Sequence, residues 1–543
     1  MKRKAFISGV LAAAMAAGLA AGCGNQEGSA GTEASAAETA AAGETETAGA
    51  GSEAGSESGG AAAVNDGEIV TITAKLLNNT VSAEGAARVT ERLNELTEAK
   101  IGVHVDVEFI EFGSWNQTIN LMISGSEAVD VISLSPMLTI DMLEKQNALM
   151  DITELLDEYA PETVELMDKL LPSTSKNGRI YGVPKLSDMD LVRGFFMRED
   201  ILEEMGMLEE AKNIQSWSEL EALLLAVKEA YPDMTPLYVS YNNGSTPSGA
   251  GDDCESDVFA DNSNLDTLGD SYKFVYVDPE TGSIESLYES DMYTAMIERI
   301  SRWYQEGLVY TDGAVTQDDT TTAMSGGNVF CYFGQGKSDP EVAALEIEGM
   351  TDQELIFLPL FHAETLTSNV NIFGFAVPYT AKEPEAAVQF INLMMTDPEV
   401  TNLLSYGEEG VDYVVEDGVA KYPEGVDANS VGYHSQSFLF GNELQAYPWD
   451  GSTPENQENA MDFYMNRMEI PEYFGFVADT DAITNEITAC YNATLEYRPT
   501  LECGSAEDWE QSLADFRQKL KDCGIDKIIE AYREQGAAFL ESK

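Results

Sequence analysis

Part of the chain alternates between short apolar runs and amphipathic stretches, and this alternation limits the fold more than any other feature. Runs rich in apolar and β-branched residues predict strands at 69–77, 103–109 and 129–133. Apolar residues at helical spacing predict helices at 87–99 and 115–123. The order strand, helix, strand, helix, strand is typical of a parallel open sheet, because parallel neighbours need a crossover connection. The sequence therefore predicts an α/β fold.

The same alternation returns further along the chain. Residues 238–241 and 328–333 predict strands, and residues 291–306 predict a helix between them. Two groups of such segments predict two α/β lobes built from interrupted stretches of chain. Ligands of open α/β sheets lie beyond the carboxyl ends of the strands, and Asn78 and Ser135 follow two of the predicted strands.

The first 23 residues have the pattern of an export signal. Basic residues at positions 2–4 precede a run of small apolar residues that ends at Cys23 and lacks the bulk of a spanning helix. Residues 19–23, Leu-Ala-Ala-Gly-Cys, resemble the bacterial lipobox, in which the cysteine becomes the first mature residue and carries a lipid. This resemblance implies that residues 1–22 are a signal peptide and that Cys23 is lipidated. An uncleaved anchor, or a plain signal with an incidental cysteine, is the alternative.

Residues 23–66 form the next unit, a lipidated cysteine followed by an acidic tether. The stretch after the cysteine consists almost entirely of Gly, Ala, Ser, Thr and Glu and contains no Lys, Arg or aromatic residue. Such a composition cannot bury a core, so we expect a disordered tether. The folded part is predicted to begin near Gly67.

Charge and cysteine content exclude several classes of function. The chain has 95 acidic and 30 Lys and Arg residues, a formal net charge of -65, which excludes nucleic acid and anionic lipid surfaces as partners. The remaining cysteines are odd in number and contain no C-x-x-C pair, which argues against a full disulfide framework and a metal site. We expect no cofactor, and a bridge between Cys490 and Cys503 stays open. These cysteines are Cys254, Cys331, Cys490, Cys503 and Cys523.

Several segments, in order, resemble the signatures of extracellular solute-binding proteins of ABC importers, here of a lipoprotein subfamily with a C-terminal helical extension. The segments are 124–131, 176–184 (Lys-Asn-Gly-Arg-Ile-Tyr-Gly-Val-Pro), 197–206, 303–307 (Trp-Tyr-Gln-Glu-Gly), 373–378 (Phe-Gly-Phe-Ala-Val-Pro), 384–390, 406–413, 440–442, 474–476, 496–497, 503–504 and 520–524. The resemblance implies a periplasmic-binding-protein-like α/β fold, with two interleaved lobes, a hinge and a ligand cleft between them.

The resemblance also suggests how the chain divides into lobes. We expect lobe I to comprise residues 67–187 and 326–378, and lobe II to comprise residues 188–325 and 379–470. Residues 471–543 are expected to form a helical segment that packs on the lobes.

A receptor function follows from the same resemblance. Members of the family close two lobes on a small solute, often a mono- or oligosaccharide, and deliver it to membrane permease subunits without catalysis. We therefore expect a monomeric receptor, anchored by lipid on the extracellular face of the cell membrane. A peptide or amino-acid receptor and a tethered surface glycosidase are the alternatives. The enzyme is disfavoured because the folded part contains neither Gly-x-Ser-x-Gly nor His-Glu-x-x-His.

Sugar sites combine aromatic faces with Asp, Glu, Asn and Ser side chains. Among the tryptophans, Trp449 is favoured because its loop is rich in turn formers, whereas Trp115 has equal prospects of stacking on a sugar and of lying in the core. The predicted ligand-binding residues are Asn78, Trp115, Ser135, Asp188, Tyr241, Phe333, Asn371, Glu409 and Trp449.

Overall fold

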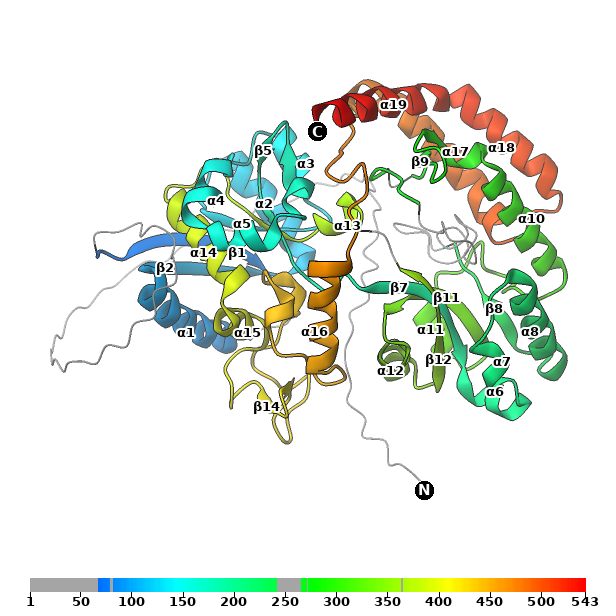
Figure 1. Ribbon diagram of the computed structural model, residues 1–543, viewed down its shortest axis with the longest axis horizontal. Coiled ribbons are helices and arrows are strands. Elements are labelled where there is room, and N and C mark those ends of the chain that lie inside the picture. Colours follow the sequence, from blue (N-terminus) through cyan, green and yellow to red (C-terminus); the bar gives the residue numbers. More distant parts are fainter. Residues whose placement is uncertain (1–66, 79–81, 242–264, 271, 363–364) are drawn as a thin grey trace, which may run out of the picture.

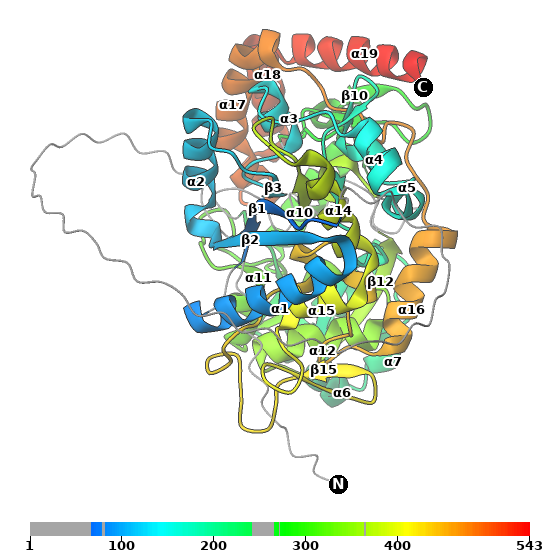
Figure 2. The same ribbon diagram turned by 90° about the vertical axis from the view of Figure 1, so that its left-hand side faces the viewer.

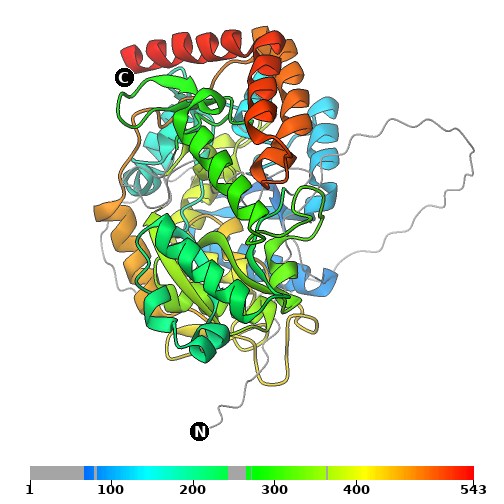
Figure 3. The ribbon, with the colours of Figure 1, turned by 90° about the vertical axis from the view of Figure 1, so that its right-hand side faces the viewer.

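The computed structural model describes residues 67–543 apart from 79–81, 242–264, 271 and 363–364. Figure 1 shows two α/β lobes side by side and a group of helices at one end of the molecule. Figures 2 and 3 show the same helices at that end from both sides, so they form a third layer across the lobes. The predicted signal peptide, Cys23 and the tether lie outside the described residues.

Lobe I is built on a five-stranded sheet with the order β2-β1-β3-β13-β6. β1 pairs in parallel with β2 along its whole length and also in parallel with β3, as predicted from the alternation. β13 pairs antiparallel with both β3 and β6, so the sheet is mixed. The strands are β1 (Val70–Leu77), β2 (Val103–Ile110), β3 (Val131–Leu134), β6 (Val183–Pro184) and β13 (Gly374–Ala376).

Helices cover this sheet, and local residue choices set their ends. Ser82 begins the first helix by accepting a hydrogen bond from Gly85 N (3.0 Å), and Gly102 ends it with φ 67 in the left-handed region. The helices are α1 (Ala83–Ile101), α2 (Phe112–Gly125), α3 (Ile140–Lys145), α4 (Thr153–Tyr159), α5 (Pro161–Met167), α13 (Thr367–Val370), α14 (Pro384–Thr396), α15 (Pro398–Tyr406) and α16 (Pro454–Asp462). Two small hairpins lie beside them, β4 (Ser175–Lys176) with β5 (Arg179–Ile180) and β14 (Val414–Glu416) with β15 (Val419–Lys421).

Lobe II is built on a four-stranded sheet with the order β12-β7-β11-β8. β7 lies between β12 and β11 and pairs antiparallel with both, whereas β8 is parallel to β11. The strands are β7 (Leu191–Arg198), β8 (Thr235–Tyr238), β11 (Val329–Lys337) and β12 (Leu355–His362). The helices beside them are α6 (Glu199–Met205), α7 (Leu208–Ala211), α8 (Trp217–Ala230), α11 (Thr320–Ser325) and α12 (Pro340–Thr351).

The structure corrects the expected division into lobes. Residues 326–362 were expected in lobe I, but β11 and β12 flank β7 in the lobe II sheet. Residues of α14 and α15 were expected in lobe II, but they belong to the same buried core as β1. The apolar pattern of a segment predicts that it forms a strand, but it does not identify the neighbouring strand. The sheet to which a strand belongs is decided by its hydrogen-bonded partner, which can lie far away in the sequence.

The last helices, residues 484–542, share a core with a hairpin and a helix of lobe II. This core, the C-terminal module, contains the buried residues Tyr288, Tyr293, Cys490 and Phe516. Its elements are β9 (Val275–Val277), β10 (Ile284–Ser286), α10 (Asp291–Gln305), α17 (Thr484–Glu502), α18 (Trp509–Cys523) and α19 (Ile525–Ser542).

A buried ion pair within α17 accepts a hydrogen bond from α10 and so joins the two parts of this module. Arg498 Nε donates to Glu502 Oε1 at 2.6 Å, and Tyr293 of α10 donates its hydroxyl to the same oxygen at 2.9 Å. The Arg498 and Glu502 side chains are only 4% and 1% exposed. The last helices therefore are tied to lobe II by polar as well as apolar contacts.

Cys490 and Cys503 cannot form the bridge left open above. They lie near opposite ends of α17, and a helix rises about 1.5 Å per residue, so their backbones are roughly 20 Å apart. A disulfide needs Cα atoms within about 7 Å of each other. Cys331, Cys490, Cys503 and Cys523 are free thiols, and Cys254 lies outside the described residues.

Candidate ligand-binding site

Two segments carry the chain between the lobe sheets. Residues 185–190 connect β6 to β7, and the segment after β12 returns through α13 to β13. We call the region around these crossings the seam. Figure 1 shows the first crossing as the strand that leads from lobe I into β7, with α16 between the lobes. A hinge-like connection of this kind lets the lobes change their angle with few contacts broken.

At the seam, Lys185 lies against aromatic rings of lobe I. Its ammonium is 5.1 Å from the centre of the Phe373 ring and 4.7 Å from that of Phe438. The two rings are 5.1 Å apart, and Phe112 meets Phe373 edge to face at 6.3 Å. Burial lowers the pKa of Lys185, an effect that Glu443 opposes and Lys337 reinforces. No described side chain forms an ion pair with this ammonium, so it is available to a polar ligand.

Charged groups from both lobes surround this lysine. Asp188 in the crossing pairs with Lys337, at the end of β11, at 3.0 Å. Glu443 of lobe I accepts a hydrogen bond from Ser437 Oγ at 3.0 Å, and its backbone N donates to Leu186 O in the crossing at 2.8 Å.

Glu346 on α12 of lobe II interacts electrostatically with the same charged groups. Burial raises the pKa of Glu346, Lys337 opposes this shift, and Asp188 and Glu443 add to it. Burial acts to lower the pKa of Lys337, but Asp188, Glu443 and Glu346 outweigh it and raise that pKa. Because these groups come from both lobes, a change in the lobe angle changes their interaction energy.

An aromatic cluster in the loops of lobe I lies beside Glu443. The Trp449 ring centre is 4.3 Å from His434, 4.9 Å from Tyr406 and 4.8 Å from Tyr422. Trp449 and Tyr422 are half-buried. Burial raises the pKa of Tyr406, and the charge of Glu443 adds to that shift. Apolar ring faces next to a carboxylate are the chemistry that a sugar needs.

His434 is the titratable member of this cluster. Burial lowers its pKa to about 4, although Asp412 opposes the shift. Its Nδ1 has no hydrogen-bond partner among the described residues. The imidazole is therefore neutral at pH 7.

The structure places five of the predicted ligand-binding residues in the interior. Trp115, the side chain in question above, is 0% exposed in the lobe I core and offers no ring face to a ligand in this arrangement. The others in this group are Asn78, Ser135, Tyr241 and Phe333, all less than a tenth exposed. Asn78 Nδ2 donates to the hydroxyl of buried Tyr433 at 3.3 Å, so a loop of lobe I covers the end of β1.

The other four predicted residues have different surroundings. Asn371 donates its Nδ2 to Ser173 O at 3.0 Å, and Glu409 is exposed. Asp188 lies in the seam, and Trp449 lies in the aromatic cluster. Sequence reasoning missed Lys185, Phe373 and Phe438, although Phe373 lies in one of the segments that carry the resemblance.

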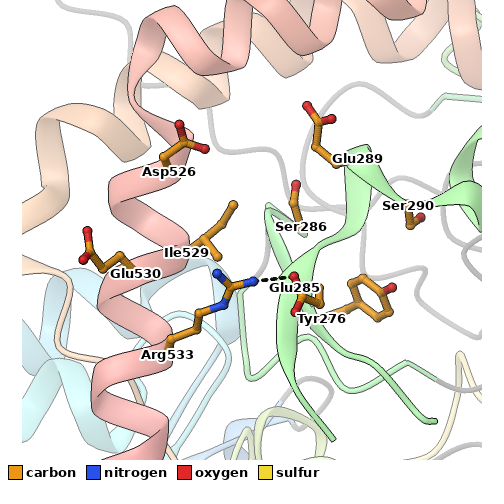
Figure 4. Close-up of a pocket in the computed structure, with 9 residues that line it drawn as sticks. All are labelled: Tyr276, Glu285, Ser286, Glu289, Ser290, Asp526, Ile529, Glu530 and Arg533. Carbon is orange, nitrogen blue, oxygen red and sulfur yellow. Dashed lines mark hydrogen bonds and ion pairs between the residues drawn. The ribbon is translucent and has the colours of Figure 1, made fainter. Parts of the chain in front are cut away.

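A hollow lies away from the seam, in the C-terminal module. It has a volume of about 680 Å³ and opens between β10 and α19. Figure 4 shows Asp526 and Arg533 on the α19 side and Glu285 and Glu289 on the facing side, with Arg533 paired to Glu285 across the hollow. The lining residues are Tyr276, Glu285, Ser286, Glu289, Ser290, Asp526, Ile529, Glu530 and Arg533. This hollow is acidic and belongs to one lobe only, so lobe closure does not enclose it.

Comparison with protein families decides the class of the chain. The sequence profile described as bacterial extracellular solute-binding protein matches residues 83–401, more than half of the chain. The protein belongs to this family. Members of the family are extracellular proteins, and a second profile, a domain of unknown function (DUF3502), matches residues 472–541.

Individual members of this solute-binding family and solved structures support the assignment. A carbohydrate ABC transporter substrate-binding protein of Streptococcus pneumoniae serotype 4 is 21% identical over 455 residues, covering 83% of this chain and 87% of that protein. The N-glycan transport solute-binding protein NgtS of S. pneumoniae has a TM-score of 0.72 at 19% identity, over 87% of this chain and 99% of that one. An extracellular solute-binding protein of Bifidobacterium longum subsp. infantis has a TM-score of 0.64 at 14% identity, over 88% and 99%. These structures confirm the predicted two-lobed α/β fold.

Among the described residues, no helix combines the length and the apolar character needed to cross a membrane. The same residues contain no group of three or more His, Cys, Asp or Glu side chains placed to hold a metal ion.

Proposed function

We propose that this solute-binding protein is the receptor of a carbohydrate ABC importer, and that it binds a mono- or oligosaccharide at the seam and presents it to permease subunits. The observation that carries the proposal is the convergence at the seam of aromatic rings, carboxylates from both lobes and a lysine with no ion-pair partner in the described part of the chain. A ligand that contacts both lobes stabilises the closed state by its differential affinity for that state. Binding and closure need no catalytic group, so we propose no enzymatic step.

Related structures support a sugar as the solute. NgtS has been solved in complex with Man1GlcNAc and Man5GlcNAc, and against these complexes this chain has TM-scores of 0.63 and 0.60.

We propose the following roles at the seam. The Lys185 ammonium donates hydrogen bonds to sugar oxygens, since it already lies between two rings and lacks an ion-pair partner. Asp188 and Glu443 accept hydrogen bonds from sugar hydroxyls, and Trp449 provides an apolar face. Of the residues predicted from sequence, Asp188 and Trp449 are thus retained.

Isothermal titration calorimetry and thermal shift against a panel of solutes test the function. We expect saturable binding and a raised melting temperature with mannose- and N-acetylglucosamine-containing oligosaccharides, but not with peptides or amino acids. A melting shift produced only by peptides would favour the alternative receptor. Hydrolysis of a bound oligosaccharide during the titration would favour the glycosidase.

A matched pair of variants tests the site. Lys185→Met keeps the apolar stem but removes the charge, and we expect the dissociation constant to rise about tenfold or more, because a charge-assisted hydrogen bond contributes roughly 1.5–3 kcal/mol. Lys100→Met is the control, since Lys100 also belongs to lobe I but pairs with Asp397 at 2.5 Å on the surface of α1. Equal affinities of the two variants would remove Lys185 from the site.

We also propose that Cys23 anchors the receptor to the extracellular face of the cell membrane. A lipid and a tether keep a receptor at high effective concentration near its permease. The variant Cys23→Ser, expressed in a bacterium that processes lipoproteins, should leave the membrane fraction. Membrane retention equal to that of the natural chain would refute the lipid anchor.

A further inference from the structure

The last two helices before α19 pack in a defined antiparallel register. The Tyr497 ring of α17 stacks on the Phe516 ring of α18, with centroids 5.5 Å apart and planes at 23°. Cys490 precedes Tyr497 by seven residues, and Cys523 follows Phe516 by seven. Seven residues are about two helical turns and return to the same helix face. Because α17 and α18 are antiparallel, seven residues back from Tyr497 and seven residues forward from Phe516 lead to the same end of the helix pair. Cys490 therefore lies opposite Cys523.

Contacts between the first turns of α17 and the end of α18 agree with this register. Cys490 Sγ lies 3.7 Å from Leu520 O, one turn before Cys523 on the same face of α18. A Cβ added to Gly524 would lie 2.8 Å from Glu486 Cγ, so the turn after α18 touches the first turn of α17. Lys527 Nζ pairs with the Glu486 carboxylate at 2.6 Å and holds the same turn. The helices are thus close where the two cysteines meet.

The two thiols differ in access to solvent. Cys490 is fully buried, whereas Cys523 is half-buried. Burial raises the pKa of Cys490 to about 12, and Cys523 and Glu486 add to that shift. A reagent from solvent therefore meets Cys523 first, and Cys490 is the thiol that reacts afterwards.

We propose that Cys490 and Cys523 form a disulfide in the exported protein, which pins α17 to the end of α18. The family's extracellular location provides the setting in which such bonds persist. The other described cysteines offer no comparable pair, since Cys503 lies at the far end of α17 and Cys331 lies in the lobe II core.

The reaction is a thiol–disulfide exchange with an extracytoplasmic disulfide-bearing oxidant. The Cys523 thiolate attacks one oxidant sulfur, which forms a mixed disulfide and releases the other oxidant sulfur as a thiol. The Cys490 sulfur, losing its proton, then attacks the Cys523 sulfur and releases the second oxidant thiol. Two protein thiols are oxidised to one disulfide, and one oxidant disulfide is reduced to two thiols.

The bond would restrain the acidic hollow. Asp526, on its wall, lies three residues after Cys523 in the turn that opens α19. Closing a loop over residues 490–523 also removes freedom from the unfolded chain. We therefore expect the oxidised protein to melt several degrees higher than the reduced protein.

Mass spectrometry of the full chain, exported by its host and alkylated without reduction, tests the proposal. We expect the denatured protein to take up two fewer alkyl groups than the same protein alkylated after reduction, and a digest in which one cross-linked peptide pair contains Cys490 and Cys523. Cys523→Ser, at a half-buried position, should lose both signals and the effect of reductant on melting. Cys503→Ala is the control and should keep them.

Two results would overturn the disulfide. One is an all-thiol mass for the exported natural chain, which needs no variant and so does not depend on folding of a mutant. The other is a cross-link that joins a different pair, such as one containing Cys254. Because neither measurement involves a solute, their failure is separate from failure of the proposed receptor function.

Discussion

Removal of Arg498 should destabilise the protein far more than removal of a surface arginine in the same kind of pair. The Glu502 carboxylate is 1% exposed, and without Arg498 it retains only the Tyr293 hydroxyl, at 2.9 Å. Its second oxygen already lacks a partner among the described residues. A buried charge left without its counter-ion typically costs about 3–5 kcal/mol.

Aromatic contacts add to this cost. The Arg498 guanidinium lies 5.7 Å from the ring centres of both Tyr241 and Tyr288, and such contacts contribute about 0.5–1 kcal/mol each. We therefore expect Arg498→Met to lower the free energy of unfolding by about 4 kcal/mol.

Urea denaturation followed by circular dichroism measures this loss. Arg302→Met is the matched control: Arg302 lies on α10, pairs with Glu221 at 2.6 Å and has a side chain 47% exposed, so its loss should cost at most about 1 kcal/mol. The double variant Arg498→Met/Glu502→Leu should be more stable than Arg498→Met alone, because it leaves no buried charge. The reasoning is wrong if Arg498→Met costs no more than the control, or if the double variant is the least stable of the three.

Two further variants test the cluster at Trp449 and the lobe II sheet. The pKa of His434, about 4 in the folded protein, lies below its unfolded value of about 6.5. Its contribution to stability is therefore complete above pH 6.5 and is lost as pH falls towards 4, by about 3 kcal/mol. Denaturant titrations should show a flatter pH dependence for His434→Gln over this window, and curves that stay parallel would contradict the shift. Gly194→Ala should destabilise lobe II by at least about 1 kcal/mol, because its Cβ would lie 2.0 Å from Leu358 O of β12. Thermal melting should show the loss, whereas Gly349→Ala, with nothing within 4 Å of the new Cβ, should melt no lower than the natural chain.

Local patterns predicted the first lobe well. The strands and helices expected between 69 and 133 all form, and β1, β2 and β3 are parallel as predicted. Trp303 lies at helical spacing from Ile300 and is 2% exposed, in the core of lobe II. Such predictions succeed because apolar periodicity reports which face of an element is buried.

The candidate site was predicted less well than the fold. A strand end is exposed only if no later segment covers it, and the loop that carries Tyr433 covers Asn78. Lys185 was missed because a lone lysine has no pattern, and Phe373 and Phe438 reach it only after the chain has crossed between the lobes twice.

The amino-acid sequence alone determined the α/β class, the family and the acidic, receptor-like character of this protein, because local periodicity, composition and ordered motifs carry that information. Only the tertiary structure decided which sheet receives β11 and β12, which tryptophan lies buried, and which charges meet at the seam. Those features depend on pairing between residues far apart in the chain. The free energy of such pairing comes from burial and hydrogen bonds that exist only once both partners are in place.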